Sequence, residues 1–230
     1  YLNNSKAPLN QVDLRRAVSW ATDYEGMVKG ILSGNGKQMR GPIPEGMWGF
    51  DATAMQYSFD EAKAKAALEK VKDKPASLTF LYSDNDPNWE PIALSTQASL
   101  GKIGINVKLE KLANATKRDR VGKGDYDIAI GNWSPDFADP YMFMNYWFES
   151  DKKGLPGNRS FYENKEVDSR MQLCQRFFPR LRIVLRELRH VSLHLQGRQR
   201  AAQLVGGIGR KAALAGHHLL GTCEEVIQRV

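Results

Sequence analysis

The first 170 residues contain neither histidine nor cysteine. A Ser–His–Asp or Cys–His catalytic site is therefore excluded from this segment, because each requires an imidazole. Zinc sites built on histidine or cysteine ligands are excluded for the same reason. Acid–base chemistry by carboxylates, and metal binding by carboxylates alone, remain open.

A long hydrophobic run is also absent. No apolar stretch in the 230 residues approaches the ~20 residues that a transmembrane helix needs, so the sequence does not predict an integral membrane protein. The chain begins with Tyr1 rather than Met, and no basic and then apolar leader opens it. We expect either that a signal peptide has been removed or that the natural N-terminus lies outside this sequence.

The net charge of +7 is unevenly distributed. Residues 1–170 carry 23 Lys+Arg and 23 Asp+Glu, whereas residues 171–230 carry 10 and 3. The last 60 residues also hold all four His and both Cys, lack Asp, Asn, Trp and Tyr, and use nine Arg to one Lys. Basic segments of this kind bind nucleic acid or anionic membrane surfaces, so this alternative function applies to residues 171–230 alone.

Two further features of that segment suggest sites. Several apolar residues among the arginines of 176–200 fall on one helical face, which is typical of a basic amphipathic helix for membranes or RNA. They are Leu181, Leu185, Leu188, Val191 and Leu195. His190 and His194 have the i, i+4 spacing of metal ligands. Pro179 and the alternation in Leu181-Arg182-Ile183 compete with both interpretations, because they break the helical period.

Hydrophobic periodicity in residues 1–170 predicts an α/β fold, since the expected helices alternate with the expected strands. A capping box at Ser58–Glu61 is expected to start the second helix. Residues 41–57 hold two Pro and three Gly and predict an ordered loop. The expected helices are 10–32, 62–72, 89–103 and 114–122, and the expected strands are 77–82, 105–112 and 126–130.

The segment 126–148 is the candidate site, because ligands of open α/β sheets bind beyond the carboxyl ends of strands. Trp133 and Asp136 follow the strand, and a Trp beside a carboxylate suits an amphipathic cation. The competing interpretation makes the aromatics core and the Asp residues caps, with Asp139 and Pro140 as N-cap and first helical residue. Acid–base catalysis by Asp136 and Asp139 is a third alternative.

Motifs along residues 1–170 resemble family 5 extracellular solute-binding proteins, the dipeptide-, oligopeptide- and nickel-binding components of bacterial ABC importers. The stretches that carry the resemblance are YLNNSKAPL, VDLRRAVSWATDYEGMVKGILSGNG, GPIPEGMWGFD, YSFDEAKAKAAL, LGKIGINVKLEKL, GDYDIAIGNWSPDFADPYMFMNYWF and NRSFYENKEVDSR. The resemblance implies the C-terminal lobe of a two-lobed periplasmic-binding-protein (type II) fold, with a mixed sheet and flanking helices. The N-terminal lobe is expected to precede Tyr1 and to be absent from this sequence.

The resemblance also implies a function. Such a protein is monomeric, sits in the periplasm or on a lipid anchor at the extracellular face, and closes two lobes on a small peptide or related solute. It then delivers that solute to an ABC permease in the membrane. The resemblance implies no catalysis, cofactor, metal or nucleic acid, and a fragment of this kind is expected to be inactive alone.

The resemblance further assigns roles to two residues. Asp136 matches the position that pairs with the ligand's N-terminal ammonium, and Trp133 matches a residue that lines the same pocket. Ile130 stands where some relatives carry a basic residue that helps hold the ligand carboxylate, so the identity and length of the ligand stay open. The resemblance stops near Arg170, where composition changes abruptly. We therefore divide the chain into a family segment, 1–170, and an anomalous basic segment, 171–230, that we interpret as the product of a frameshift, with a genuine appended domain as the alternative.

Overall fold

Three parallel strands form the centre of the fold in residues 1–173, which are the residues that the computed structural model describes. Strand β1 (Ser77–Tyr82) pairs with β2 (Asn106–Lys111) on one side and with β3 (Ile128–Ala129) on the other. Leu2 adds an antiparallel bridge to Ile128, which gives the sheet its mixed character. Parallel neighbours need crossover connections, and helices supply both of them.

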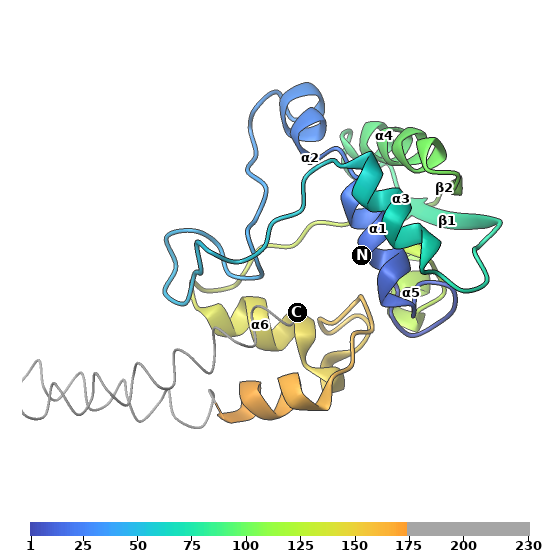
Figure 1. Cartoon of the computed structure of the whole chain (residues 1–230). Helices are drawn as coiled ribbons and strands as arrows, with labels where there is room; N and C mark the ends of the chain where they lie inside the picture. Colours follow the sequence, from blue (N-terminus) through green and yellow to red (C-terminus); the bar gives the residue numbers. More distant parts are fainter. Residues whose placement is uncertain (174–230) are drawn as a thin grey trace, which may run out of the picture.

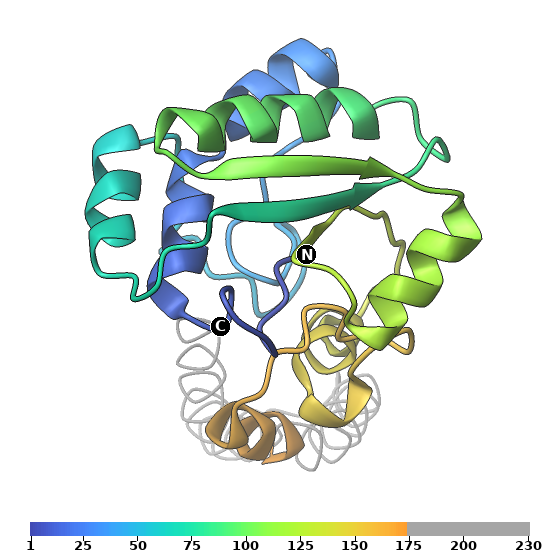
Figure 2. The ribbon, with the colours of Figure 1, turned by 90° about the vertical axis from the view of Figure 1, so that its right-hand side faces the viewer.

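Helices surround this sheet (Figures 1 and 2). Helix α4 connects β1 to β2 and runs along the sheet, and α5 connects β2 to β3. A further helix covers residues 165–173. The other described helices have these bounds: α1 (Val12–Ala21), α2 (Tyr24–Gly26), the π-helix η1 (Met27–Ile31), α3 (Glu61–Glu69), α4 (Trp89–Lys102), α5 (Asn114–Lys123), α6 (Pro140–Phe148) and the 3-10 helix η2 (Ser150–Lys152).

Alternate residues of β1 are buried on its two faces, as the two-residue period of a strand requires. Leu78 and Phe80 join the main core with apolar residues of α1, α3 and α4. Leu81 points the other way and packs with Val121 of α5 and Tyr126. Full burial of such a side chain stabilises the fold by about 1.5–3 kcal/mol, so helices on both faces hold β1 at the centre.

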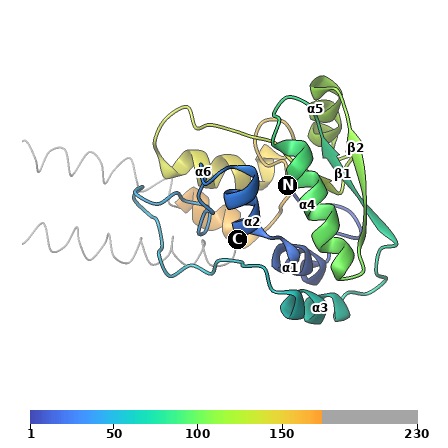
Figure 3. The same cartoon turned by 90° about the horizontal axis from the view of Figure 1, so that it is seen from above.

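A second group of helices lies apart from the sheet. Figures 1 and 3 both place α6 and the helix over 165–173 side by side, away from β1 and β2. Met144, Val167 and Met171 form their shared core, with Ile43 and Ala54 of the long loop. Met171 is 3% exposed, so the packed structure continues past the boundary that composition placed at 170. The basic segment from residue 174 onward, with its arginines and His190 and His194, lies outside the described residues.

Most expected elements are confirmed, but two helix starts differ. The helix expected over 10–32 is interrupted at Thr22, whose backbone is extended and whose hydroxyl donates to the carbonyl of Val18 at 2.8 Å. Asp23 then accepts from the backbone nitrogen of Gly26 at 2.9 Å and starts a new helix. The prediction that Ser58 caps the second helix is wrong, because Asp60 is the N-cap residue of α3. The strand expected over 126–130 is reduced to β3.

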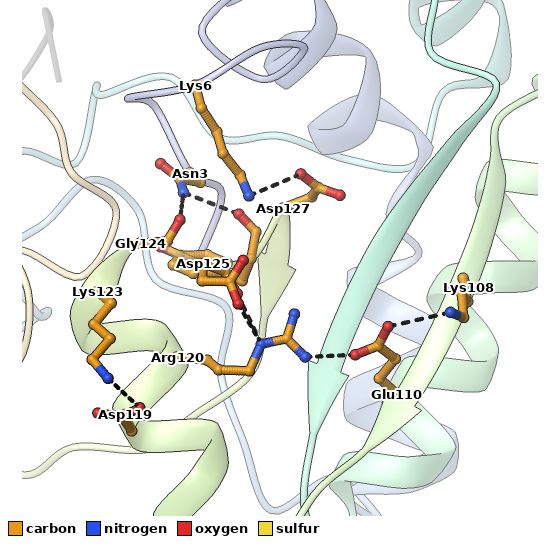
Figure 4. A network of polar contacts seen from close by, with 11 residues as sticks. Asn3, Lys6, Lys108, Glu110, Asp119, Arg120, Lys123, Gly124, Asp125 and Asp127 are labelled. Atoms are coloured by element: carbon orange, nitrogen blue, oxygen red, sulfur yellow. Dashed lines mark hydrogen bonds and ion pairs between the residues drawn. The ribbon is translucent and has the colours of Figure 1, made fainter.

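Buried polar side chains fix the loops around the sheet. Asn3 is fully buried and donates through Nδ2 to the carbonyls of Gly124 and Tyr126, at 2.8 and 3.0 Å (Figure 4). Asp127 accepts from the backbone nitrogen of Thr79 at 2.9 Å. The Asn3 bonds hold the first residues of the chain beside β3, and the Asp127 bond joins β1 to the residue that precedes β3. Within residues 1–173, the helices are all too short or too polar to cross a membrane.

Candidate ligand-binding site

The loop that carries the candidate residues leaves the sheet at the carboxyl end of β3. The backbone nitrogen of Ile130 still donates to the carbonyl of Leu81 at 3.1 Å, after which the chain departs from the sheet. Trp133 is half-buried in this loop, whereas Asp136 is exposed. The structure therefore places both residues beyond a strand end, as the sequence predicts, but it puts them in different environments.

Trp133 belongs to an aromatic cluster. Its ring meets Phe143 and Trp147 edge-on, with centroids 5.5 and 5.3 Å apart, and stacks on Tyr146 at 5.9 Å. All three partners lie on α6, so this helix determines where the indole sits. Tyr1 extends the cluster by stacking on Trp147 at 5.8 Å. Because Trp133 stays only half-buried, part of its ring remains available to a ligand.

Asp139 has the capping role that one interpretation of the sequence gave it. Its Oδ1 accepts from the backbone nitrogen of Tyr141 at 2.9 Å, and Pro140 is the first residue of α6. Asp136 lies outside the helix, in the exposed part of the loop. In the part of the chain that the structure describes, no group of three or more His, Cys, Asp or Glu is placed to hold a metal ion.

Two pockets flank the end of β3. A larger one, of about 250 Å³, is mostly apolar and lies between this strand and helices α1, α2 and α4. A smaller one, of about 60 Å³, is polar and lies toward α5. Tyr1, Ile130 and Gly131 line both pockets, so the strand end forms the wall between them.

Lys117 lines the polar pocket and is almost completely buried, at 4% exposure. Its Nζ donates to the carbonyl of Ile130 at 3.1 Å and lies 3.5 Å from the ring centroid of Trp89. Burial, and then the positive charge of Arg159, lower the pKa of Lys117 to about 8. The sequence analysis missed this residue, because a lysine on a short polar helix carries no signal of burial.

Arg159 brings a second cation to the same pocket from the loop after η2. Its guanidinium carbon lies 5.0 Å from the ring centroid of Trp147 and 5.7 Å from that of Tyr1. Its Nη1 donates to the Tyr1 hydroxyl at 3.1 Å. The buried Nε of Arg159 has no hydrogen-bond partner within the described residues. The aromatic cluster and the polar pocket are thus joined through Tyr1, Trp147 and Arg159.

Residues 1–154 match the bacterial extracellular solute-binding proteins, family 5, in the middle region of that family. The chain therefore belongs to this family, and the resemblance that the motifs indicated is confirmed. Among its relatives, it is 87% identical to the probable D,D-dipeptide-binding periplasmic protein DdpA of Escherichia coli K12 over 168 residues. This match covers 73% of the chain and 33% of the relative.

A dipeptide-binding protein of Escherichia coli K12 is 27% identical over 175 residues, which are 74% of the chain and 33% of the relative. The chain thus spans about a third of the length of these relatives. It also resembles the solved periplasmic binding protein DppA of Helicobacter pylori in complex with the peptide STSA. That similarity has a TM-score of 0.69 and 29% identity and covers 76% of this chain and 34% of the other.

A dipeptide-binding protein from Pseudoalteromonas sp. SM9913, solved with Met-Leu, gives a TM-score of 0.68 at 25% identity. It is matched over 74% of this chain and 35% of its own. These similarities confirm the expected fold class, part of the two-lobed fold of periplasmic binding proteins.

Proposed function

We propose that the chain is part of the substrate-binding component of a bacterial ABC importer and that its ligand is a short peptide, with D,D-dipeptides as the first class to test. The observation that carries the proposal is the 87% identity to a relative named for D,D-dipeptide binding. The complete protein acts in the periplasm, as its relatives' names indicate, or on a lipid anchor. It delivers its ligand to a membrane permease without catalysis or a cofactor.

The geometry supports a peptide ligand at the strand end. Asp136 supplies an exposed carboxylate for the ligand's ammonium group, and Trp133 supplies an aromatic surface fixed by α6. The larger pocket at the end of β3 is mostly apolar, which suits a ligand side chain. Closure of the second lobe over this end would then remove both groups from water.

The basic segment 171–230 has a separate origin in this proposal. Two observations support a frameshift: translation in a wrong reading frame of GC-rich DNA would give such a composition, and the 87% identity extends over 168 residues rather than over the whole chain. The coding DNA around codons 165–175, translated in all three frames, tests this directly. A family-like continuation in another frame supports the frameshift, whereas stop codons in both alternative frames would require the segment to be treated as genuine.

A graft provides the binding test. Residues 1–170 replace the matching third of the Escherichia coli relative, and calorimetry measures binding of D-alanyl-D-alanine, its L,L-isomer and tri- to pentapeptides. We expect saturable binding of at least one peptide, with the D,D-dipeptide preferred. If the grafted protein is folded and binds none of them, the peptide assignment fails, and nickel chelates and oligosaccharides become the candidates. The alternative function, nucleic-acid binding through residues 171–230, is tested by titrating the 230-residue chain with nucleic acid. It predicts binding that weakens strongly as the salt concentration rises.

A further inference from the structure

An exposed segment, residues 33–37, follows η1 and opens the long loop that leads to α3. All of its residues are exposed, and Ser33 and Gly34 have positive φ angles of 51° and 77°. Asn35 and Gly36 come next in the chain. Figure 1 shows the chain running from the helices at α2 toward α6, away from β1 and β2. The segment is thus a water-exposed bend outside the proposed ligand site.

Asn35 is the one asparagine of the 230 residues that a glycine follows. The side chain of an asparagine can react with the backbone nitrogen of the next residue, and this makes asparagine a labile residue in proteins. A side chain on the next residue obstructs that approach, whereas glycine has no Cβ and leaves it open. Asn114, by contrast, is followed by Ala115 and begins α5, where the helical backbone is fixed.

The two groups that would react at Asn35 are not engaged elsewhere in the described part of the chain. Neither the side-chain amide of Asn35 nor the backbone nitrogen of Gly36 has a hydrogen bond to any of residues 1–173. The buried Asn158 differs, because its Nδ2 donates to the carbonyls of Glu149 and Tyr162. Reaction at Asn35 therefore breaks no hydrogen bond of the reacting groups.

The backbone before the reactive bond is anchored to η1. The nitrogen of Gly34 donates to the carbonyl of Val28, and that of Asn35 donates to the carbonyl of Leu32, each at 2.8 Å. The peptide unit between Asn35 and Gly36 has no such bond within residues 1–173. It can therefore rotate and bring its nitrogen toward the Asn35 side chain while the preceding residues stay in place.

We propose that Asn35 is a site of spontaneous deamidation, at which water converts the asparagine into aspartate and isoaspartate. The backbone nitrogen of Gly36 attacks Cγ of Asn35, and the side-chain nitrogen leaves as ammonia with the proton that the backbone nitrogen loses. Water then opens the resulting cyclic imide at either carbonyl. Its hydroxyl stays on the carbonyl carbon and its remaining proton returns to the nitrogen, so no oxidant, metal or enzyme is needed.

Deamidation would change both the charge and the path of the chain at this point. A neutral side chain becomes a carboxylate two residues from Lys37, which pairs with Glu45 in the unmodified loop. In the isoaspartyl form the main chain passes through the former side chain and is one carbon longer. The inference is independent of the proposed function, because this loop carries neither Trp133 nor Asp136.

The test incubates the folded grafted protein at pH 8 and follows each asparagine of residues 1–170 by mass spectrometry of its peptides. The peptide with Asn35 should gain the mass that separates an acid from an amide and should become a substrate for an isoaspartyl methyltransferase. Its rate should exceed that at Asn114 by at least about ten-fold, which corresponds to a barrier lower by about 1.4 kcal/mol. A free peptide with the sequence of residues 31–38 gives the intrinsic rate for comparison.

Gly36→Ala is the main variant, because it adds only the Cβ that should obstruct the nitrogen. This atom would lie 3.0 Å from the terminal Cδ1 of Leu32, which can move, and Gly36 is not among the residues with positive φ. Deamidation at Asn35 should slow by about ten-fold or more. Gly101→Ala is the matched control, since a Cβ there meets no atom within 4 Å, and it should leave the rate at Asn35 unchanged.

An intact Asn35 in the folded graft, under conditions in which the free peptide reacts, would overturn the proposal because the fold would then protect the residue. Equal rates at Asn35 and Asn114, or an unchanged rate in Gly36→Ala, would also overturn it. Asn35→Gln removes the reactive asparagine and should abolish methyltransferase labelling of this peptide. Labelling that persists in Asn35→Gln would assign the isoaspartate to another residue and remove Asn35 as the site.

Discussion

Asp139 accepts a hydrogen bond from the backbone nitrogen of Tyr141 at 2.9 Å, and this contact begins the helix that carries the partners of Trp133. Asp136, only three residues earlier, lies exposed in the loop. Two carboxylates that look alike in the sequence therefore have different physical roles. One orients an aromatic surface through a helix, and the other is available to a ligand.

The cap should affect stability more than binding. Asp139→Ala removes the side-chain acceptor at the start of α6, and loss of an N-cap typically costs about 1 kcal/mol. We expect the free energy of unfolding of the grafted protein to fall by that amount in urea, with peptide affinity changed by less than three-fold. Asp136→Ala serves as the control and should leave stability unchanged. A larger loss of affinity than of stability in Asp139→Ala would contradict its assignment as a cap.

Asp136 should affect binding more than stability. Asp136→Asn removes the negative charge that we propose for the ligand's ammonium group, and a charged hydrogen bond is typically worth ~1.5–3 kcal/mol. Peptide affinity should fall by roughly ten- to several-hundred-fold, at about 1.4 kcal/mol for each factor of ten. Calorimetry with a peptide that the unmodified graft binds provides the measurement, and unchanged affinity would remove Asp136 from the site.

Asn158 should be a strong determinant of local stability. Its buried Nδ2 donates to the carbonyls of Glu149 and Tyr162, at 3.1 and 2.8 Å, and its Oδ1 accepts from the backbone nitrogen of Tyr162 at 3.0 Å. Asn158→Ala leaves these groups unsatisfied, at about 1–3 kcal/mol for a buried group. We expect a loss of about 2–4 kcal/mol in urea unfolding, because several groups are affected together. The exposed Asn35 provides the control, as Asn35→Ala should be nearly neutral.

The buried lysine should make stability depend on pH. Burial lowers the pKa of Lys117 from 10.5 to about 8, so the folded lobe binds this proton less tightly than the unfolded chain does. Between these two values the unfolded chain carries more protons, and the free energy of unfolding rises with pH by at most about 1.4 kcal/mol per pH unit. Lys117→Met abolishes this contribution.

The measurement is the difference in Tm between the Lys117→Met graft and its parent, at pH 7 and pH 9.5 and without ligand. The variant is expected to have its greatest relative stability at pH 7, where the parent buries a charge, and to lose that advantage by pH 9.5. Lys123→Met, at an exposed position of the same helix, should show no such trend. A constant difference between the two pH values would show that Lys117 does not titrate in this range.

Local patterns account for much of the fold. The strict alternation over 105–112 predicted β2, because one face of that strand is buried, and the apolar run at 77–82 predicted β1. The hydrophobic period predicted one continuous helix over 10–32, which is wrong. Short-range hydrogen bonds made by Thr22 and Asp23 interrupt the helix there and outweigh the hydrophobic period. Asp60 likewise replaced Ser58 as a cap, since both residue types serve equally well.

The candidate site could be predicted only in part from the sequence. The strand end and the loop with Trp133 and Asp136 could be located, because a strand, a turn and aromatic residues follow one another in the chain. Lys117 and Arg159 could not, because their positions depend on the packing of α5 and of a loop that is 42 residues further along. Burial of a lysine against Trp89 is a tertiary effect without a local signature.

Tyr1 contacts β3, the aromatic cluster and both pockets at the same time. Its backbone carbonyl accepts from the nitrogen of Ala129 at 3.0 Å, its ring stacks on Trp147, and its side chain lines both pockets. A Cβ atom added at Gly131 would lie 3.0 Å from the Tyr1 hydroxyl, so the two residues are already in close contact. Displacement of this one tyrosine would therefore reshape the apolar and the polar pocket together.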